Sequence, residues 1–80
     1  MEKFNAQDAK EIGDDLGIDW NTVTLDEFTR GLNAEIDYGS RFPETIAFKK
    51  LVGKIVRAHL NEFPDYYTRL EKMVLAAAEF

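Results

Sequence analysis

Apolar residues recur along the chain at the three- and four-residue spacing of amphipathic helices. Glycine and proline divide this pattern into four segments, and no segment shows the strict alternation of a half-buried strand. The pattern therefore predicts an all-α fold, a compact single-domain bundle of about four helices over residues 1–80. A chain of this length fits one domain.

The first predicted helix runs from about Ala6 to Leu16, because Ala9, Ile12 and Leu16 share one face. Asn5 precedes it and is a residue type that caps helix N-termini. Gly17 follows it and suits a left-handed C-terminal cap. Both ends of this helix are therefore marked in the sequence.

The second predicted helix runs from about Leu25 to Tyr38 and ends at Gly39. Thr24 and Glu27 have the spacing of a capping box, in which each side chain satisfies a free backbone amide of this helix. Trp20 lies in the connection between the first two helices, and we expect it to pack over the core as a lid.

The third predicted helix begins between Pro43 and Ile46 and runs to Asn61 or Glu62. Its apolar face is the broadest in the chain and is typical of a central helix; it comprises Phe48, Leu51, Val52, Ile55, Val56 and Leu60. We expect Leu51, Ile55 and Val56 to be among the least exposed residues. Gly53 predicts a close approach of another helix.

The fourth predicted helix starts at Pro64 and Asp65, since proline is tolerated in a first turn. Its expected inner face comprises Tyr66 or Tyr67, Leu70, Met73 or Val74, and Ala77. Pro64 ends the third helix at about Phe63. We expect Phe63 and one tyrosine to be buried at this corner, with a tyrosine hydroxyl holding it and an i,i+4 ion pair between Asp65 and Arg69.

The composition offers few residues that could carry out catalysis or bind a cofactor. The chain has no cysteine, which excludes disulfides, thiolate metal ligands and a thiol nucleophile. Its longest apolar run is six residues, Met73 to Ala78, far shorter than a membrane span, and its N-terminus has no apolar signal region, so we expect a cytoplasmic protein without a membrane span. No phosphate-binding glycine loop or Ser-His-Asp spacing is present. These features predict no enzyme activity and no cofactor.

Charge is distributed unevenly. Residues 1–40 carry ten acidic and three basic side chains, whereas residues 41–80 carry five acidic and seven basic ones. An acidic half is often only a solvated face, but it also suits a basic protein partner. The partner-binding residues that the sequence suggests are Asp14, Asp15, Asp19, Trp20, Asp26, Glu27 and Phe42.

A metal site is an alternative. His59 and Glu62 are three residues apart on a predicted helix and share a face. Glu35 on the second helix joins them if the two helices pack antiparallel. Carboxylate-bridged metal bundles use about four carboxylates and two histidines, more than these three residues supply. A metal site of this kind would therefore need the ligands of two copies, that is, a homodimer. The competing interpretation is that His59 makes a hydrogen bond near the end of its helix.

The segment from Ile12 to Val23 imitates a helix-turn-helix motif, with Gly13 and Gly17 at its small positions. The helix that would read DNA carries Asp26 and Glu27 and has no basic residue before Arg30. Because phosphate contacts supply most non-specific DNA affinity, this charge argues against nucleic-acid binding. A regulator of this kind remains a second alternative.

Three segments together resemble a family of small bacterial, archaeal and phage proteins catalogued only as a domain of unknown function. They are IGDDLGIDW (residues 12–20), FTRGLNAE (residues 28–35) and GKIVRAHLNEFPDYYTRL (residues 53–70). The chain departs from the family pattern at Tyr38-Gly39, where members have a His-Gly pair followed by a longer polar loop. The resemblance implies a helical fold and a microbial or phage setting, without an activity or a substrate.

We therefore hypothesise a non-catalytic, acidic interaction protein that binds a protein partner, as a phage or mobile-element accessory. The metal-binding bundle and the DNA-binding regulator stay open beside it.

Overall fold

The computed structural model describes residues 4–39 and 46–78. Four helices follow one another along the chain: α1 (Ala6–Leu16), α2 (Leu25–Gly39), α3 (Ile46–Glu62) and α4 (Tyr66–Ala78). The described residues form no strand, so the prediction of an all-α bundle of four helices is confirmed. None of the helices in the described part of the chain is both long and apolar enough to cross a bilayer.

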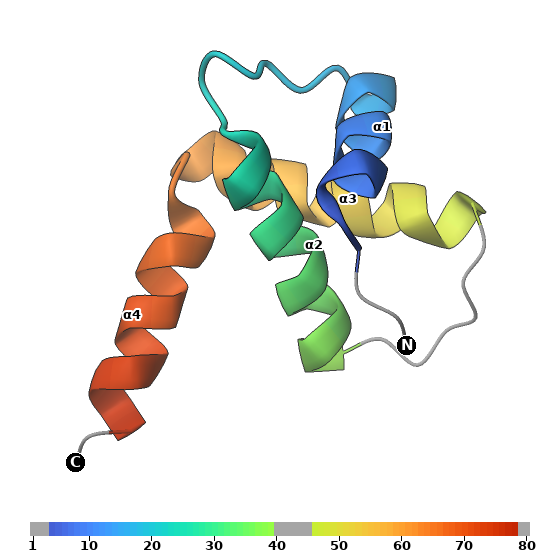
Figure 1. The fold of residues 1–80 in the computed structure, drawn as a ribbon. Helices are drawn as coiled ribbons and strands as arrows, with labels where there is room; N and C mark the ends of the chain where they lie inside the picture. The colour runs from blue at the N-terminus through green and yellow to red at the C-terminus, as the bar shows by residue number, and fades with distance from the viewer. Residues whose placement is uncertain (1–3, 40–45, 79–80) are drawn as a thin grey trace.

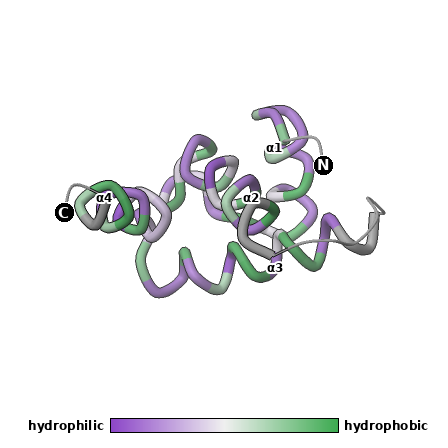
Figure 2. Tube along the Cα trace, turned by 90° about the horizontal axis from the view of Figure 1, so that it is seen from below, coloured by the Kyte–Doolittle hydropathy of each residue, from purple (hydrophilic) through white to green (hydrophobic). Residues whose placement is uncertain are grey.

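Helices α2 and α3 form the centre of the fold, and α1 packs against both (Figure 1). Helix α4 packs against α2 and α3 but, within the described residues, does not contact α1. It leaves the body of the molecule at one edge, away from α1 (Figure 2). This layout places the connection between α1 and α2, residues 17–24, beside the C-terminal end of α3.

Local signals set the ends of α1. Asn5 accepts a hydrogen bond from the Asp8 amide at 2.8 Å, and the Asp8 carboxylate accepts one from the Asn5 amide at 3.3 Å. Gly17 adopts a left-handed conformation with φ of 74°, which costs a side-chain-bearing residue energy. The Ile18 amide then reaches the Gly13 carbonyl at 2.9 Å. Both predicted caps are confirmed.

The core is built mainly from α2 and α3. Phe28 and Leu32 of α2 and Val56 of α3 are fully buried. The remaining buried apolar side chains are Phe4, Ala9, Val23, Ile36, Val52, Leu60 and Tyr67. The prediction for Val56 is confirmed, but Leu51 is 55% exposed and Ile55 is 40% exposed, so the expectation that these two are core residues is wrong.

Two glycines explain which arc of α3 is buried. A Cβ on Gly53 would lie 2.7 Å from Leu16 and 2.8 Å from Ile12, so α1 packs directly on this point of α3. A Cβ on Gly31 of α2 would lie 2.6 Å from both Val56 and Tyr67. The close approach predicted at Gly53 is confirmed. It selects the arc of α3 that contains Gly53 and turns Leu51 and Ile55 toward solvent.

Helix α4 is attached by its first turns only. Tyr67 is buried and Leu70 is half-buried, whereas Met73, Val74 and Leu75 are all exposed. The expected inner face is therefore wrong at Met73 and Val74, where α4 diverges from α2 (Figure 1). The side chain of Ala77 lies outside the described part of the structure. Phe63 is also exposed, with the Arg69 guanidinium 4.9 Å above its ring, so its predicted burial is wrong. The Asp65–Arg69 ion pair is confirmed at 2.7 Å.

Candidate functional site

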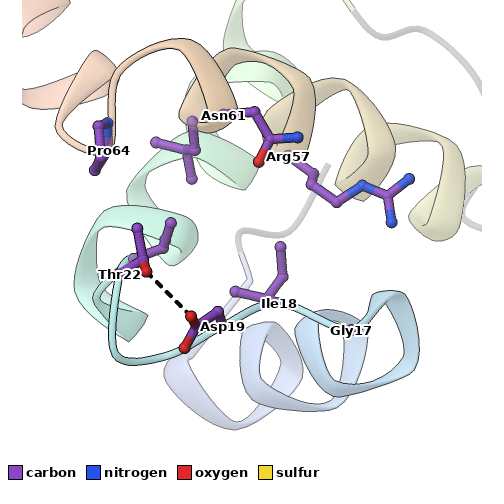
Figure 3. Close-up of a pocket in the computed structure, with 9 residues that line it drawn as sticks. Gly17, Ile18, Asp19, Thr22, Arg57, Asn61 and Pro64 are labelled. Atoms are coloured by element: carbon purple, nitrogen blue, oxygen red, sulfur yellow. Dashed lines mark hydrogen bonds between the residues drawn. The ribbon is translucent and has the colours of Figure 1, made fainter.

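A pocket of about 260 Å³ lies between the α1–α2 connection and the C-terminal end of α3 (Figure 3). Its apolar lining includes the buried side chains of Val23 and Leu60 and the half-buried Ile18. Its remaining lining residues are Gly17, Asp19, Thr22, Arg57, Asn61 and Pro64. An apolar interior with a few polar groups at the edge is typical of ligand and anchor-residue sites. The volume suits one large side chain.

The two charged residues of the pocket are held differently. Arg57 donates from Nη1 to the Leu16 carbonyl at 2.9 Å, which satisfies a free acceptor at the end of α1. Figure 3 shows this side chain pointing away from Asn61 and Asp19. Asp19 accepts hydrogen bonds from the Asn21 amide at 2.9 Å and the Thr22 hydroxyl at 3.1 Å. These bonds orient the Asp19 carboxylate without neutralising its charge.

Most of the acidic residues expected to bind a partner are already paired with cations of this chain. Asp14 lies 2.6 Å from Lys10, Asp15 lies 2.9 Å from Lys50, and Asp26 lies 3.0 Å from Arg30. The ion pairs of the described residues do not include Asp19. Asp19 is therefore the acidic residue of this set that is best placed to meet an external cation, and it lies at the pocket.

Trp20 packs as the sequence predicts. Its ring meets Phe28 edge to face with centroids 5.8 Å apart, and its Nε1 donates to Asp14 at 2.8 Å. A Cβ on Gly13 would lie 2.4 Å from the Trp20 ring, so the indole covers the glycine closely. Phe42, the other aromatic residue suggested as a binding contact, lies outside the described residues.

We expect acid titration of Asp14 to change the emission of Trp20, the single tryptophan. Hydrogen bonds from Lys10 and Trp20 hold the pKa of the Asp14 carboxyl below its ordinary value of 3.8. Because the folded-state pKa is lowered, the stabilisation is complete above 3.8 and is lost as the pH falls through the folded-state pKa. Tryptophan fluorescence should titrate with a midpoint below 3.8, and Asp14→Asn should abolish that transition. A midpoint at or above 3.8 while the helical signal is intact contradicts this pairing.

Two predictions for Glu27 are wrong: that it lies on an exposed acidic surface, and that its carboxylate caps α2. Its side chain is buried, so it cannot belong to an exposed acidic surface. Thr24 does cap α2 by accepting from the Glu27 amide at 3.1 Å, but the carboxylate of Glu27 turns away to α4. There one carboxylate oxygen accepts from the Tyr67 amide at 2.7 Å and from the Thr68 amide at 3.0 Å, and the other accepts from the Thr68 hydroxyl.

This contact completes the N-terminus of α4. The Tyr66 amide reaches the Phe63 carbonyl and the Arg69 amide reaches the Asp65 carbonyl, each at 3.0 Å. With Tyr67 and Thr68 bound to Glu27, each of the first four amides of α4 has a partner. The negative carboxylate also lies at the positive end of the helix dipole. Glu27 is thus an N-terminal cap supplied by a different helix.

A second polar cluster joins α2, α3 and α4. The Tyr67 hydroxyl donates to Glu35 at 2.8 Å, and its oxygen lies 3.0 Å from His59 Nδ1. Because the hydroxyl proton is used on Glu35, Nδ1 must carry the proton donated back to Tyr67. The His59 ring stacks on Tyr66 with centroids 4.5 Å apart. A tyrosine hydroxyl therefore does hold the α3–α4 corner, as predicted.

The structure brings together only two of the three residues of the predicted metal site, Glu35, His59 and Glu62. Glu35 and His59 do converge, with Oε2 and Nδ1 3.6 Å apart. Glu62 does not join them, since the described residues contain no group of three His, Cys, Asp or Glu side chains able to hold a metal. The third member of the cluster is instead Tyr67, whose hydroxyl lies between Glu35 and His59. Burial, together with the hydrogen bond to Glu35, raises the pKa of this hydroxyl. A proton held this firmly makes Tyr67 a poor metal ligand.

The helix-turn-helix resemblance is weakened by the length of the connection. Residues 17–24 separate α1 from α2, whereas the DNA-binding motif uses a turn of about 3–4 residues. The first turn of α2 is also occupied, because Glu27 binds α4 and Asp26 pairs with Arg30.

Sequence reasoning missed Tyr67 as a partner of Glu35 and His59, and it missed the pocket on α3. Tyr67 lies eight positions from His59 and 32 positions from Glu35 in the sequence, so no local motif reveals that these residues meet. The sequence did contain one indication of the pocket: Arg57 and Asn61 are four residues apart, so they share one face of α3.

The family model described as "Protein of unknown function (DUF5661)" matches residues 9–75. This match agrees with the resemblance seen in the sequence. The comparisons with curated proteins and with solved structures give no significant match.

Proposed function

We propose that this chain, which belongs to the family described as Protein of unknown function (DUF5661), is a non-catalytic module that binds a basic segment of a protein partner. The observation that carries the proposal is the pocket, in which an apolar interior adjoins Asp19. An apolar anchor residue of the partner enters against Val23 and Leu60. A neighbouring lysine or arginine then pairs with the Asp19 carboxylate.

The charge of the molecule supports this choice of partner. The chain carries a formal net charge of −5, and its excess of acid lies in residues 1–40, which supply one wall of the pocket. Such a field raises the encounter rate with a basic segment and disfavours an acidic one. Arg57 keeps its positive charge, but its bond to the Leu16 carbonyl holds the guanidinium at the end of α1, pointing away from Asp19 (Figure 3).

Binding should be weak and confined to the pocket. We expect short peptides with one central leucine, methionine or phenylalanine between lysines to shift the backbone amide resonances of Ile18, Asp19, Thr22 and Asn61 in a titration followed by NMR. Peptides in which glutamate replaces lysine, or glycine replaces the anchor, should not do so. Absence of pocket shifts with every basic peptide at millimolar concentration contradicts the proposal.

Two matched pairs of variants locate the contact. Asp19→Asn keeps the local turn, because asparagine makes the same backbone bonds, and should raise the Kd about 2–5-fold, as expected for an exposed charge pair. Asp26→Asn removes a charge that Arg30 already neutralises and should leave the Kd unchanged. Asn61→Trp should block the pocket, whereas Lys54→Trp, an exposed change on the same helix, should not.

Cytoplasmic location and a phage or mobile-element setting belong to the same proposal. They are supported by the cysteine-free composition and by the family resemblance.

A further inference from the structure

The exposed half of α4 has the features that the pocket selects. Met73 is 69% exposed, the most exposed large apolar side chain among the described residues. Lys72 is its neighbour in the chain, is exposed, and takes part in none of the ion pairs that the described residues form. Arg69 and Glu71, by contrast, are paired with Asp65 and Arg30. Among the exposed apolar side chains of α4, Met73 is therefore both the most exposed and directly next in the chain to a cation outside the described ion pairs.

These features lie on the side of α4 that faces away from the body. Tyr67 and Glu71 point toward α2, as their contacts with Gly31 and Arg30 show. At 100° per residue, Lys72, Met73 and Ala76 lie on the opposite side of α4. Ala76 leaves little bulk beside Met73, so a partner surface can approach the helix closely. No side chain in the described part of the structure covers Met73, which is exposed.

The pocket and α4 are also close enough within one copy for a symmetric exchange. Pro64 lines the pocket and lies two residues before the start of α4. Met73 lies seven residues after Tyr66, about 10 Å along the helix axis at 1.5 Å per residue. A twofold axis is the commonest closed symmetry of homo-oligomers. Two copies related by such an axis can each insert the Met73 side chain of one into the pocket of the other.

We infer that two copies of this chain form a reciprocal dimer, in which Met73 of each copy fills the pocket of the other and Lys72 pairs with Asp19. The inference rests on the proposed function in using the same pocket, with a second copy as the occupant. Charge complementarity supports it, because Asp19 at the pocket and Lys72 on α4 carry opposite charges and neither takes part in the ion pairs of the described residues. A basic partner segment then competes with dimerisation.

Sedimentation equilibrium tests the dimer between about 10 µM and about 1 mM, a range that covers weak association. We expect a concentration-dependent increase from the monomer to the dimer mass. Asp19→Lys and Lys72→Asp should each raise the dimer Kd at least about 10-fold, because like charges then face each other. The double variant Asp19→Lys/Lys72→Asp should dimerise at least about 3-fold more tightly than Asp19→Lys alone, because the pair is re-formed with its polarity reversed while both variants lack the Asp19 turn bonds.

Glu11→Lys and Lys54→Asp are the matched controls, since they change the net charge equally at exposed positions outside the contact. Met73→Ser provides a second disruption that leaves all charges in place and should weaken the dimer at least about 10-fold. A chain that is monomeric throughout the range overturns the inference. So does a dimer whose Kd is unaffected by Met73→Ser, or a double variant that dimerises no more tightly than Asp19→Lys alone.

Peptide binding separates this result from the proposed function. Lys72→Asp leaves the pocket intact, so it should bind the basic peptides at least as well as the parent. If Lys72→Asp binds the peptides and the parent never dimerises, the pocket proposal stands and the dimer is wrong. If the parent dimerises as described but no peptide shifts the pocket resonances, the dimer stands and the proposed partner is wrong.

Discussion

Replacing Leu60 by alanine is expected to lower the free energy of unfolding by about 2–5 kcal/mol, whereas the same replacement at Leu51 should change it by less than about 0.5 kcal/mol. Both residues belong to α3, but Leu60 is 2% exposed and Leu51 is 55% exposed. Only the first substitution removes buried methyl groups and leaves a cavity among Val56, Val23 and their neighbours. The measurement is urea denaturation followed by circular dichroism at 222 nm.

The pair of variants also tests the packing of α3 directly. A domain of 80 residues is held by roughly 4–12 kcal/mol, so Leu60→Ala removes a large part of the total. If Leu51→Ala were as destabilising as Leu60→Ala, the side of α3 that contains Leu51 would have to face the core, which would contradict the structure. Ile55→Val, at a partly exposed position of the same helix, serves as a further mild substitution.

Glu27→Ala is expected to lower the free energy of unfolding by about 2–4 kcal/mol. The carboxylate binds two backbone amides and a hydroxyl of α4, and bonds to a charged group contribute about 1.5–3 kcal/mol. Without it, the amides of Tyr67 and Thr68 lose their acceptor, and α4 loses an opposite charge at its N-terminus. Thermal denaturation should show a fall in Tm of roughly 4–8 °C for each kcal/mol.

Asp26→Ala is the control for this prediction, since Asp26 is adjacent, acidic and exposed, and its loss should cost about 0.2–1 kcal/mol. Thr68→Val removes the hydroxyl that binds Glu27 and keeps the shape of the side chain. The double variant should then lose less stability than the two single variants added together, because they share one interaction. Strict additivity argues that Glu27 acts without Thr68.

Because α4 is attached through Glu27, Tyr67 and the Arg30–Glu71 ion pair, its exposed half depends on these few contacts for its position. A variant that loosens the cap is therefore expected to weaken the inferred dimer as well. Peptide binding at the pocket should persist while the domain stays folded, since Val23, Leu60 and Asp19 do not lie on α4.

The sequence by itself determined both ends of α1, the start of α2 and the break between α3 and α4. Asn5, Gly17 and Thr24 act within one turn of their own helices, so their effects are visible in the residue pattern. Pro64 does the same at the α3–α4 corner, because its missing amide hydrogen and ring geometry exclude a continuous helix. The all-α class and the ion pair between Asp65 and Arg69 follow from equally short-range spacing.

The buried side of α3 was decided by packing. Apolar residues occupy well over half of its circumference, so periodicity did not distinguish the arc of Val52, Val56 and Leu60 from that of Leu51 and Ile55. The missing side chain at Gly53 permits α1 to approach one arc, and this contact fixes the rotation.

Only the tertiary structure decided the roles of the charged and polar residues. Glu27 looked like an exposed capping-box acid, yet its carboxylate is an acceptor for α4, 40 residues away. Asp19 acquires its significance because α3 brings Leu60 and Asn61 beside it to form a pocket. A carboxylate is stabilised by whichever donors surround it in space, and helix packing supplies those donors from distant parts of the chain. The same physical reason placed His59 and Glu35 on the hydroxyl of Tyr67 and left Glu62 apart from them.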